Sequence, residues 1–392
     1  MHLLAEAAEL EHNLLCSYLF AMFSLKERED EGLTSEELAC VDRWRDSLLG
    51  VCIEEMTHLA QVANLTVAIG GRPHLNRPNI PVAAGYHPAS VAVEFTRLDI
   101  DTLDHFVFLE RPDGHAASDG ESFGSASPYV RQAHYGSLMP SAPNYETIGA
   151  FYDTLGDELR NYARDYGEAA LFSGPEEMQL RAEELHTDSL HVIVDLADAL
   201  DAIESIVREG EGSPAASDSS HFTMFVDMRD DFERLLAGNP DFVASRDVGR
   251  NPVMHAPVSD SRTHVTDPGA SAVLDAANAV YGLMLRCLAR CFETPWAQAQ
   301  TRLRLVRGCV NAMKALSVLG RALTEMNAAS NSPAMAGISF AMLRSMQGWI
   351  REEDAMSAID ERARHIRDAI ADLPVSPERR RRAEEALATF AS

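Results

Sequence analysis

Lysine is nearly absent from this chain of 392 residues, in which Lys26 and Lys314 are the only two. The 34 basic residues are therefore almost all arginine, and 60 acidic residues outnumber them to give a net charge of -26. A chain this acidic repels the phosphates of nucleic acids and of anionic membrane surfaces. We therefore expect neither nucleic acid nor a membrane as a partner.

An apolar run of about 18 residues is also lacking, and no basic N-terminal segment precedes an apolar one. Both absences predict a soluble cytoplasmic protein. The six cysteines lie within helical stripes and none belongs to a C-x-x-C pair, which argues against thiolate zinc and favours reduced thiols in a core.

The strict alternation of apolar and polar residues that is typical of β-strands is rare, whereas apolar residues recur every three or four positions, as on one face of a helix. This spacing predicts an all-α protein with helices over residues 3–26, 36–69, 101–110, 147–172, 195–209, 221–237, 270–292, 296–327, 342–371 and 376–391. We expect a helical bundle over residues 1–237 that carries the functional site, and a C-terminal helical region over residues 238–392 packed on it.

The stretch EEMTHLAQVANL, residues 54–65, places charged groups in the apolar stripe of a long predicted helix. Glu55 and His58 are three residues apart, so their side chains share one helix face. Burying an unpaired carboxylate is costly, and such a pair needs a compensating charge or a metal. The alternative is a partly solvated helix edge, with Glu54 and Glu55 in water.

A second acid interrupts the stripe of the preceding helix, where Glu11 falls among apolar positions that continue to Tyr18. Two consecutive helices with acids at mid-length predict a shared site. Glu-x-x-His on a bundle helix is the arrangement of ferritin-like di-iron carboxylate proteins, provided that other helices donate further glutamates. Tyr18 is expected in the core, with the lining of a substrate pocket as the alternative.

Further segments complete a resemblance to a known family. The chain resembles the ferritin-like domain of the iminophenyl-pyruvate dimer synthases, which couple oxidised tryptophan units in violacein- and rebeccamycin-type pathways. The similar segments keep their order over residues 3–345: LEHNLLCSYLFAMFSL, EEMTHLAQVANLTVAIGGRP, VEFTRLDIDTLDHFVFLERP, TIGAFYDTL, EGEG with SSHFTMF, and VTDPGASAVLDAANAVYGLML. The resemblance implies a ferritin-like bundle with long loops and an additional C-terminal helical region. Those synthases carry a further large region that this sequence lacks, so the fold is implied more directly than the dimerising activity.

The resemblance also implies a set of metal ligands: Glu11, Glu55, His58, Glu110, Glu211 and His221. Four carboxylates and two imidazoles are the ligands that a di-iron centre needs, and this donor set suits iron, with manganese as the alternative. Pro214 excludes a continuous helix between the last two ligands. We therefore expect Glu211 to end one helix and His221 to begin the next.

Ordinary alternatives exist for several of these assignments. Glu110 can simply terminate a helix, Glu211 can be a loop acid, and His221 can be a residue at a helix start. A second Glu-x-x-His pair, Glu183 and His186, lies in a segment that corresponds to a connection in the family.

Two positions depart from the family pattern. Glu209 stands where relatives have glutamine, and Ala150 stands where they often have an acid. The second departure implies a missing ligand or supporting group, for which Glu146 and Asp153 are substitutes about one turn away.

These expectations together indicate a non-haem di-iron oxidase or oxygenase. Its substrates would be dioxygen and a small amino-acid-derived or aromatic metabolite of a specialised pathway. Two alternatives stay open: an iron-oxidising or peroxide-removing protein without an organic substrate, and a degenerate scaffold. The long loops and C-terminal helices favour the enzyme because they can enclose a pocket. The sequence leaves a homo-oligomer open.

Overall fold

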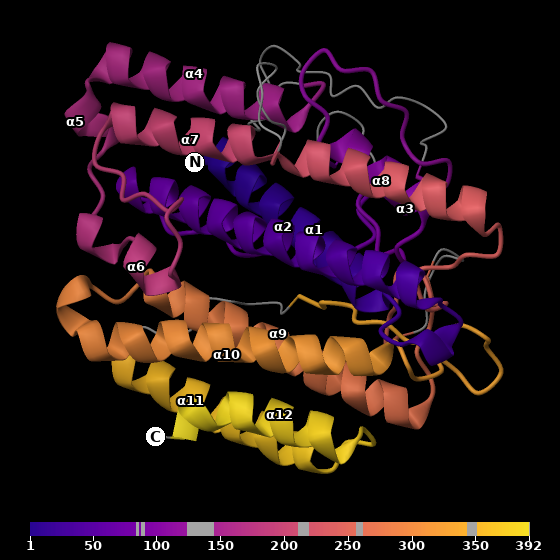
Figure 1. The fold of residues 1–392 in the computed structure, drawn as a ribbon. Coiled ribbons are helices and arrows are strands. Elements are labelled where there is room, and N and C mark those ends of the chain that lie inside the picture. Colours follow the sequence, from indigo (N-terminus) through magenta and orange to yellow (C-terminus); the bar gives the residue numbers. More distant parts are fainter. Residues whose placement is uncertain are drawn as a thin grey trace. The chain divides into compact units, whose positions relative to one another are not determined.

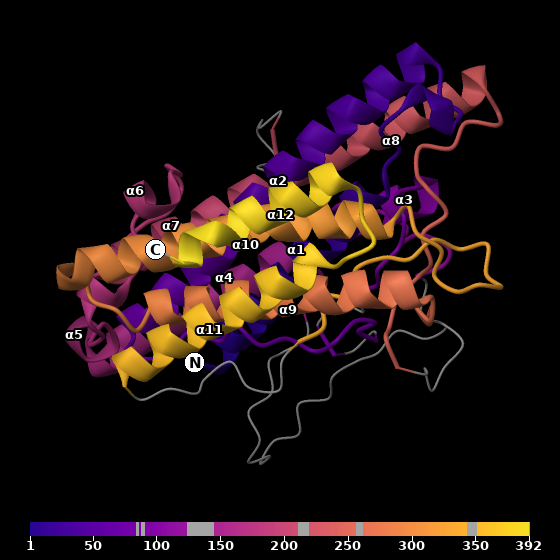
Figure 2. The same cartoon turned by 90° about the horizontal axis from the view of Figure 1, so that it is seen from below.

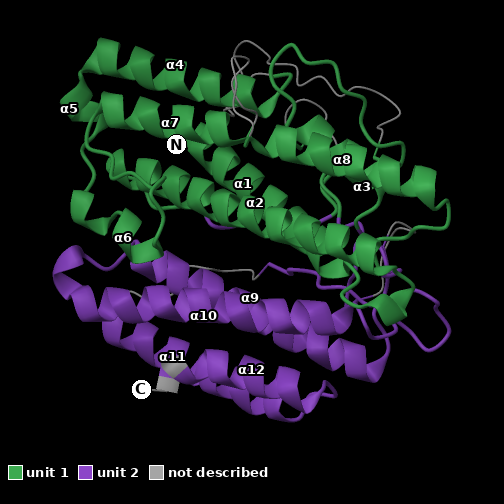
Figure 3. Ribbon diagram, viewed as in Figure 1, with its two compact units in different colours: residues 1–74, 81–94, 98–245 green, residues 75–80, 95–97, 246–392 purple. Residues whose placement is uncertain are grey.

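The computed structural model describes residues 1–83, 86–87, 91–123, 145–210, 219–255, 262–342 and 351–391. In this part of the chain the regular structure is helical, and extended backbone pairs only as isolated bridges such as Val82 with Val93. The all-α prediction is confirmed. The chain divides into two compact units, coloured separately in Figure 3. The expected domain boundary at residue 237 stays a prediction.

Unit 1 comprises residues 1–74, 81–94 and 98–245. The α-helices among its described residues, labelled in Figure 1, are α1 (His2–Ser24), α2 (Ser35–Ala68), α3 (Ile100–Leu109), α4 (Ile148–Tyr166), α5 (Glu168–Leu171), α6 (Ala182–Leu185), α7 (Leu196–Gly210) and α8 (His221–Gly238). Helix α1 packs along α2, α4 packs on α7, and α3 packs on α8. Helix α2 also contacts both α7 and α8, which places it at the centre of this bundle.

Local sequence signals set the ends of the long helix α2. Thr34 accepts a hydrogen bond from the amide of Glu37, whose side chain bonds back to Thr34, and this capping box starts the helix. After Ile69 the chain turns at Gly70 with φ +80°, a conformation that glycine adopts without strain. The helix is therefore long enough to present Glu55 and His58 from its middle.

Two pairs of helices in unit 1 are separated by long insertions in the sequence. Helix α3 ends before Glu110 and α4 begins only at Ile148, capped by Thr147. Helix α7 ends at Gly210 and α8 begins at His221; the two follow one another along one line in Figures 1 and 2. The expected start of a helix at His221 is thus confirmed. The helix predicted over 147–172 instead breaks at Gly167, which has φ +90°.

Aromatic side chains fill the core of unit 1 beside these helix ends. Tyr18 packs edge-on against Phe106 at 4.7 Å between ring centroids, and both rings contact Phe225. All three side chains are buried. A second group stacks Trp44 on Phe232 nearer the far ends of α2 and α8. These contacts hold α1, α2, α3 and α8 at fixed spacing, which a multi-helix site requires.

Unit 2 comprises residues 75–80, 95–97 and 246–392. Its α-helices are α9 (Pro268–Cys291), α10 (Ala299–Leu323), α11 (Glu352–Ala371) and α12 (Pro377–Leu387). Helix α9 packs on α10 and α11, and α12 packs on the same two helices. The buried Arg302 bonds the carbonyls of Cys291 and Thr294, which joins the start of α10 to the end of α9.

Helix α9 is an exception to the expected lack of apolar segments. By length and composition alone it could cross a membrane, and it is the one described helix that meets that test. Within its most apolar stretch, 61% of the residues are buried inside the protein. This burial is what a core helix shows, so α9 is weak evidence for a membrane span.

Candidate metal centre

Five of the six predicted ligands come together inside unit 1. Helix α1 presents Glu11, α2 presents Glu55 and His58, Glu110 directly follows α3, and His221 opens α8. None of these residues is more than 3% exposed. The sixth predicted ligand, Glu211, lies outside the described residues.

The first group of ligands is built from α1 and α2. The Nδ1 atom of His58 lies 3.5 Å from Oε2 of Glu11 and 3.9 Å from Oε2 of Glu55. One donor atom from each of these three residues lies within 4.8 Å of the others. The pairing of Glu55 with His58 on one helix face is as the i, i+3 spacing predicts.

The second group joins α2 to the ends of α3 and α8. The Nδ1 atom of His221 lies 3.0 Å from Oε1 of Glu55 and 3.9 Å from Oε2 of Glu110. These three residues also bring donor atoms within 4.8 Å of one another. Glu55 belongs to both groups, with one oxygen towards each histidine, and the two rings are 5.6 Å apart. Cations held by the two groups would therefore share Glu55 as a ligand.

Unpaired polar atoms at the centre of the cluster test whether a metal fits. Oε2 of Glu55 and Nδ1 of His221 are buried, and within the described part of the chain neither has a hydrogen bond of acceptable geometry. Leaving such atoms unsatisfied is costly, and bound cations remove the cost. Carboxylate oxygens with imidazole nitrogens suit iron or manganese, so the donor set fits the expected cofactor.

A buried tyrosine holds the outer oxygen of each terminal carboxylate. The hydroxyl of Tyr152, on α4, donates to Oε1 of Glu11, and the hydroxyl of Tyr18, on α1, donates to Oε1 of Glu110. In both carboxylates the other oxygen, Oε2, is the one nearest a histidine. The tyrosines thus fix which oxygen of each carboxylate faces the centre.

The two ring nitrogens that face away from the centre also bond to acids. Nε2 of His58 lies 3.0 Å from Oε2 of Glu209, at the end of α7. Nε2 of His221 lies 2.8 Å from Oε2 of Glu54, on α2. Each histidine is therefore held between carboxylates on both of its nitrogens.

The metal-free cluster balances negative carboxylates against protonated rings. Burial alone would lower the pKa of His58, but its contacts with Glu11, Glu209 and Glu55 outweigh burial and raise that pKa well above its usual value. Contacts with Glu110, Glu54 and Glu55 do the same for the pKa of His221. The two rings in turn outweigh burial at Glu55 and hold its pKa below the usual range.

Glu11 behaves differently from the shared carboxylate. Burial, followed by repulsion from Glu55, raises the pKa of Glu11 to about 7. Glu11, Glu55 and Glu110 are three buried acids, and they repel one another unless positive charge is supplied. A pair of divalent cations would supply that charge, and they would replace the ring protons.

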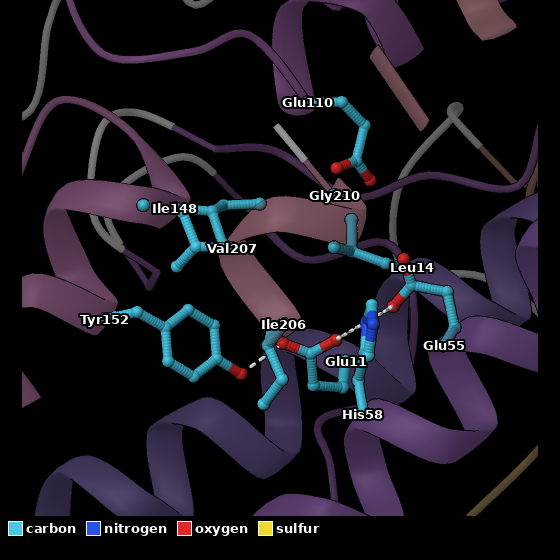
Figure 4. A pocket seen from close by; sticks show the side chains of 11 residues that line it. Glu11, Leu14, Glu55, His58, Glu110, Ile148, Tyr152, Ile206, Val207 and Gly210 are labelled. Carbon is cyan, nitrogen blue, oxygen red and sulfur yellow. Dashed lines mark hydrogen bonds and ion pairs between the residues drawn. The ribbon is translucent and has the colours of Figure 1, made fainter. Parts of the chain in front are cut away.

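A pocket adjoins the cluster, with about 280 Å³ of space that protein atoms do not fill, part of it open to solvent. Figure 4 shows Glu11, Glu55, His58 and Glu110 around it, with Tyr152 and aliphatic side chains beside them. Its aliphatic lining is Leu14, Ile148, Ile206 and Val207, and Gly149 and Gly210 complete the wall. Ends of α3, α4 and α7 all meet here, so the interruptions in the bundle open a space beside the ligands.

The remaining sequence candidates lie apart from the cluster. Glu146 and Asp153, proposed as substitutes at the Ala150 departure, have exposed side chains and do not line the pocket; Tyr152 contacts the cluster from this helix instead. Glu183 and His186 are exposed residues at the short helix α6 and belong to neither group of ligands.

Sequence reasoning missed the outer contacts of the site. Glu209 was noticed only as a departure from the family pattern, Glu54 only as a solvated neighbour, and Tyr152 was not assigned to the site. The adjacent acids Glu54 and Glu55 were a usable signal, because neighbouring residues on a helix point in different directions. When one acid faces the centre of the cluster, the other can reach the outer ring nitrogen of a histidine. Tyr152 had no such signal in the sequence.

Comparisons with known proteins point the same way as the geometry. A family model described as Ferritin-like matches residues 4–230, more than half of the chain. A solved structure of a ferritin-like protein from Caulobacter vibrioides superimposes with a TM-score of 0.53 at 17% identity, over 86% of this chain and 96% of that one. The ferritin-like fold expected from the sequence is confirmed.

Two curated proteins are similar in sequence. Dichlorochromopyrrolate synthase of Lentzea aerocolonigenes is 26% identical over 413 residues, which cover 96% of this chain and 39% of that protein. The 2-imino-3-(indol-3-yl)propanoate dimerase of Chromobacterium violaceum is 28% identical over 333 residues, which cover 80% of this chain and 31% of that protein. The chain therefore spans less than two fifths of the length of these relatives, both of which are biosynthetic enzymes.

Proposed function

Because the chain belongs to the Ferritin-like family, we propose that unit 1 is a di-iron oxidoreductase that uses dioxygen to oxidise a small organic metabolite. One observation carries the proposal. Glu55 is shared by two groups of buried ligands, and an apolar pocket lies directly against both of them.

The ligands would divide two iron ions between them. Glu11 and His58 would hold one ion, Glu110 and His221 the other, and Glu55 would bridge the two. Iron bound in this way would supply the electrons that reduce dioxygen. The protein's part is to fix the donors before the metals arrive, and the packed helix ends and tyrosine hydroxyls do so.

The pocket favours a small, largely apolar substrate. Ile148, Ile206 and Val207 offer an aliphatic surface directly beside the ligands. Among its described lining residues the only nitrogen-bearing side chain is His58. An amino-acid-derived or aromatic compound would then place its apolar group on this wall and its polar group towards the metals.

The relatives support a place in specialised metabolism. One of them is a dimerase of 2-imino-3-(indol-3-yl)propanoate, a compound with an apolar ring and a polar head. Because the chain covers less than two fifths of these relatives, the substrate of the whole protein is part of the proposal.

The test begins with metal analysis of protein purified without chelators, followed by anaerobic loading with ferrous iron. We expect about two iron ions per chain, and oxygen consumption that a panel of aromatic amino-acid-derived imines and keto acids accelerates. Continued accumulation of iron in a soluble shell, without acceleration by any organic compound, would show an iron-handling protein instead. Failure to bind iron or manganese would show a degenerate scaffold.

A further inference from the structure

We propose that Glu54 and Glu209 are positioning residues of the metal centre. Each would hold the ring of one histidine by its outer nitrogen, so that Nδ1 of that ring faces the metals. The inference rests on the proposed function in one respect only, which is that the cluster binds metal.

His58 shows the arrangement most completely. Its Nδ1 faces Glu11 and Glu55 inside the cluster, and its Nε2 lies 3.0 Å from Oε2 of Glu209. The other oxygen of Glu209 accepts a hydrogen bond of 3.1 Å from Ser205 on the same helix. The carboxylate is therefore itself held in place, with its side chain only 19% exposed.

His221 repeats the arrangement with unrelated elements. Its Nδ1 faces Glu55 and Glu110, and its Nε2 lies 2.8 Å from Oε2 of Glu54. The side chain of Glu54 is 42% exposed, so water screens this contact more than the one at Glu209. The same outer contact thus occurs once in each group of ligands.

The chemistry of imidazole gives these contacts their role. A neutral ring carries one proton, and a carboxylate that accepts the Nε2 proton leaves the lone pair of Nδ1 for the metal. The contact also stops rotation of the ring and increases its basicity as a ligand. Neither acid needs to bind the metal itself to have this effect.

The two contacts cross between the helices. Glu54 of α2 holds the histidine of α8, whereas Glu209 of α7 holds the histidine of α2. Helices α7 and α8 both have an end at the site, because α7 stops at Gly210 and α8 starts at His221. Each acid therefore supports one metal position: Glu209 the position of His58, and Glu54 the position of His221.

The experiment uses cobalt(II) as the probe with the full chain. Titrations of wild type, Glu209→Leu and Glu54→Leu are compared with a control, Glu204→Leu. This control removes an exposed acid from α7, the helix that carries Glu209. Loss of an outer-shell partner typically weakens metal binding by about 10- to 100-fold. We expect Glu209→Leu towards the upper end of that range, Glu54→Leu towards the lower end, and Glu204→Leu unchanged.

Each leucine variant should weaken the binding of one of the two cobalt ions, and the double variant should weaken the binding of both. Glutamine at either position keeps a carbonyl oxygen that accepts the Nε2 proton, so Glu209→Gln and Glu54→Gln should recover most of the affinity. Circular dichroism confirms that each variant is folded. The recovery separates positioning from a general effect on packing.

Proton NMR of the cobalt-loaded protein gives a readout independent of affinity. The wild type should show two exchangeable, paramagnetically shifted ring N–H resonances, and each leucine variant should lose one of them. The inference is overturned if cobalt-loaded wild type lacks these resonances, or if both leucine variants bind cobalt like wild type. Wild type that binds no cobalt, manganese or iron would instead overturn the proposed function.

Discussion

Replacing Glu55 by alanine should abolish both metal positions, whereas replacing Glu11 or Glu110 should abolish only one. The difference follows from the shared position of Glu55, which has one oxygen towards His58 and the other towards His221. Glu11 and Glu110 each belong to a single group. Wild type should therefore bind about two metal ions per chain, the Glu11 and Glu110 variants about one, and Glu55→Ala almost none.

The magnitude can be worked out from mass action. At a free metal concentration of 100 times Kd, one site stabilises the folded state by about 2.7 kcal/mol, and two independent sites by about 5.4 kcal/mol. For a unit of this size each kcal/mol shifts Tm by roughly 2–4 °C, so loading should raise the Tm of wild type by roughly 11–22 °C. The Tm of the Glu11 and Glu110 variants should rise by about half of this, and that of Glu55→Ala by almost nothing.

The assay records thermal unfolding by circular dichroism with and without Mn²⁺, together with elemental analysis of the loaded protein. Comparing each variant with its own metal-free form removes any effect of the substitution on the metal-free fold. Asp46→Ala, an exposed position on the same helix, serves as the matched control and should behave like wild type. Retention of a full metal complement by Glu55→Ala would refute the shared-ligand reasoning, as would an equal loss in all three variants.

Three further predictions concern the surroundings of the ligands. Both site histidines have raised pKa values, so below those values each ring carries a proton that a metal must displace. Metal affinity should therefore fall as pH falls. A pH-indicator dye in weakly buffered solution should record about one proton released per bound ion at neutral pH. Tyr152→Phe leaves a buried carboxylate oxygen without its donor and should cost about 1–3 kcal/mol in urea unfolding of the metal-free protein, whereas the exposed Tyr162→Phe should cost little. In Gly210→Ala the new Cβ would lie 3.3 Å from Oε2 of Glu110 and crowd it, so calorimetric titration should show weaker binding of one of the two metal ions. Gly238→Ala, whose Cβ meets nothing within 4 Å, should bind metal as wild type does. Equal metal affinities in the two variants would contradict the proposed crowding of Glu110.

Much of the helical framework follows from sequence signals that act over a few residues. The apolar spacing and the Thr34 capping box predicted helix α2 to within a residue at each end, because backbone hydrogen bonds and caps depend on near neighbours. The differences lie inside or at the ends of other predicted helices. The predicted helix over 147–172 breaks at Gly167, and the one over 296–327 begins with a short 3-10 turn before α10.

The site shows the same division. The i, i+3 spacing of Glu55 and His58 was enough to place both on one face of a helix, and the cost of burying them indicated a compensating charge or a metal. The further ligands came from a resemblance in sequence rather than from local geometry. That resemblance named Glu110 and His221, which the structure places beside Glu55; the role of all these residues as metal ligands, including Glu211, stays a prediction.

By itself, then, the sequence determined an acidic all-α chain with charged groups on the buried faces of two neighbouring helices, because helix periodicity and charge are properties of the chain's own order. Only the tertiary structure decided which oxygen of Glu55 faces which histidine, and that Glu209 and Glu54 hold the outer ring nitrogens. Glu209 is 151 residues from His58, and Glu54 is 167 residues from His221. Contacts over such separations depend on how the helices pack and where the interrupted ones end, which no local spacing encodes.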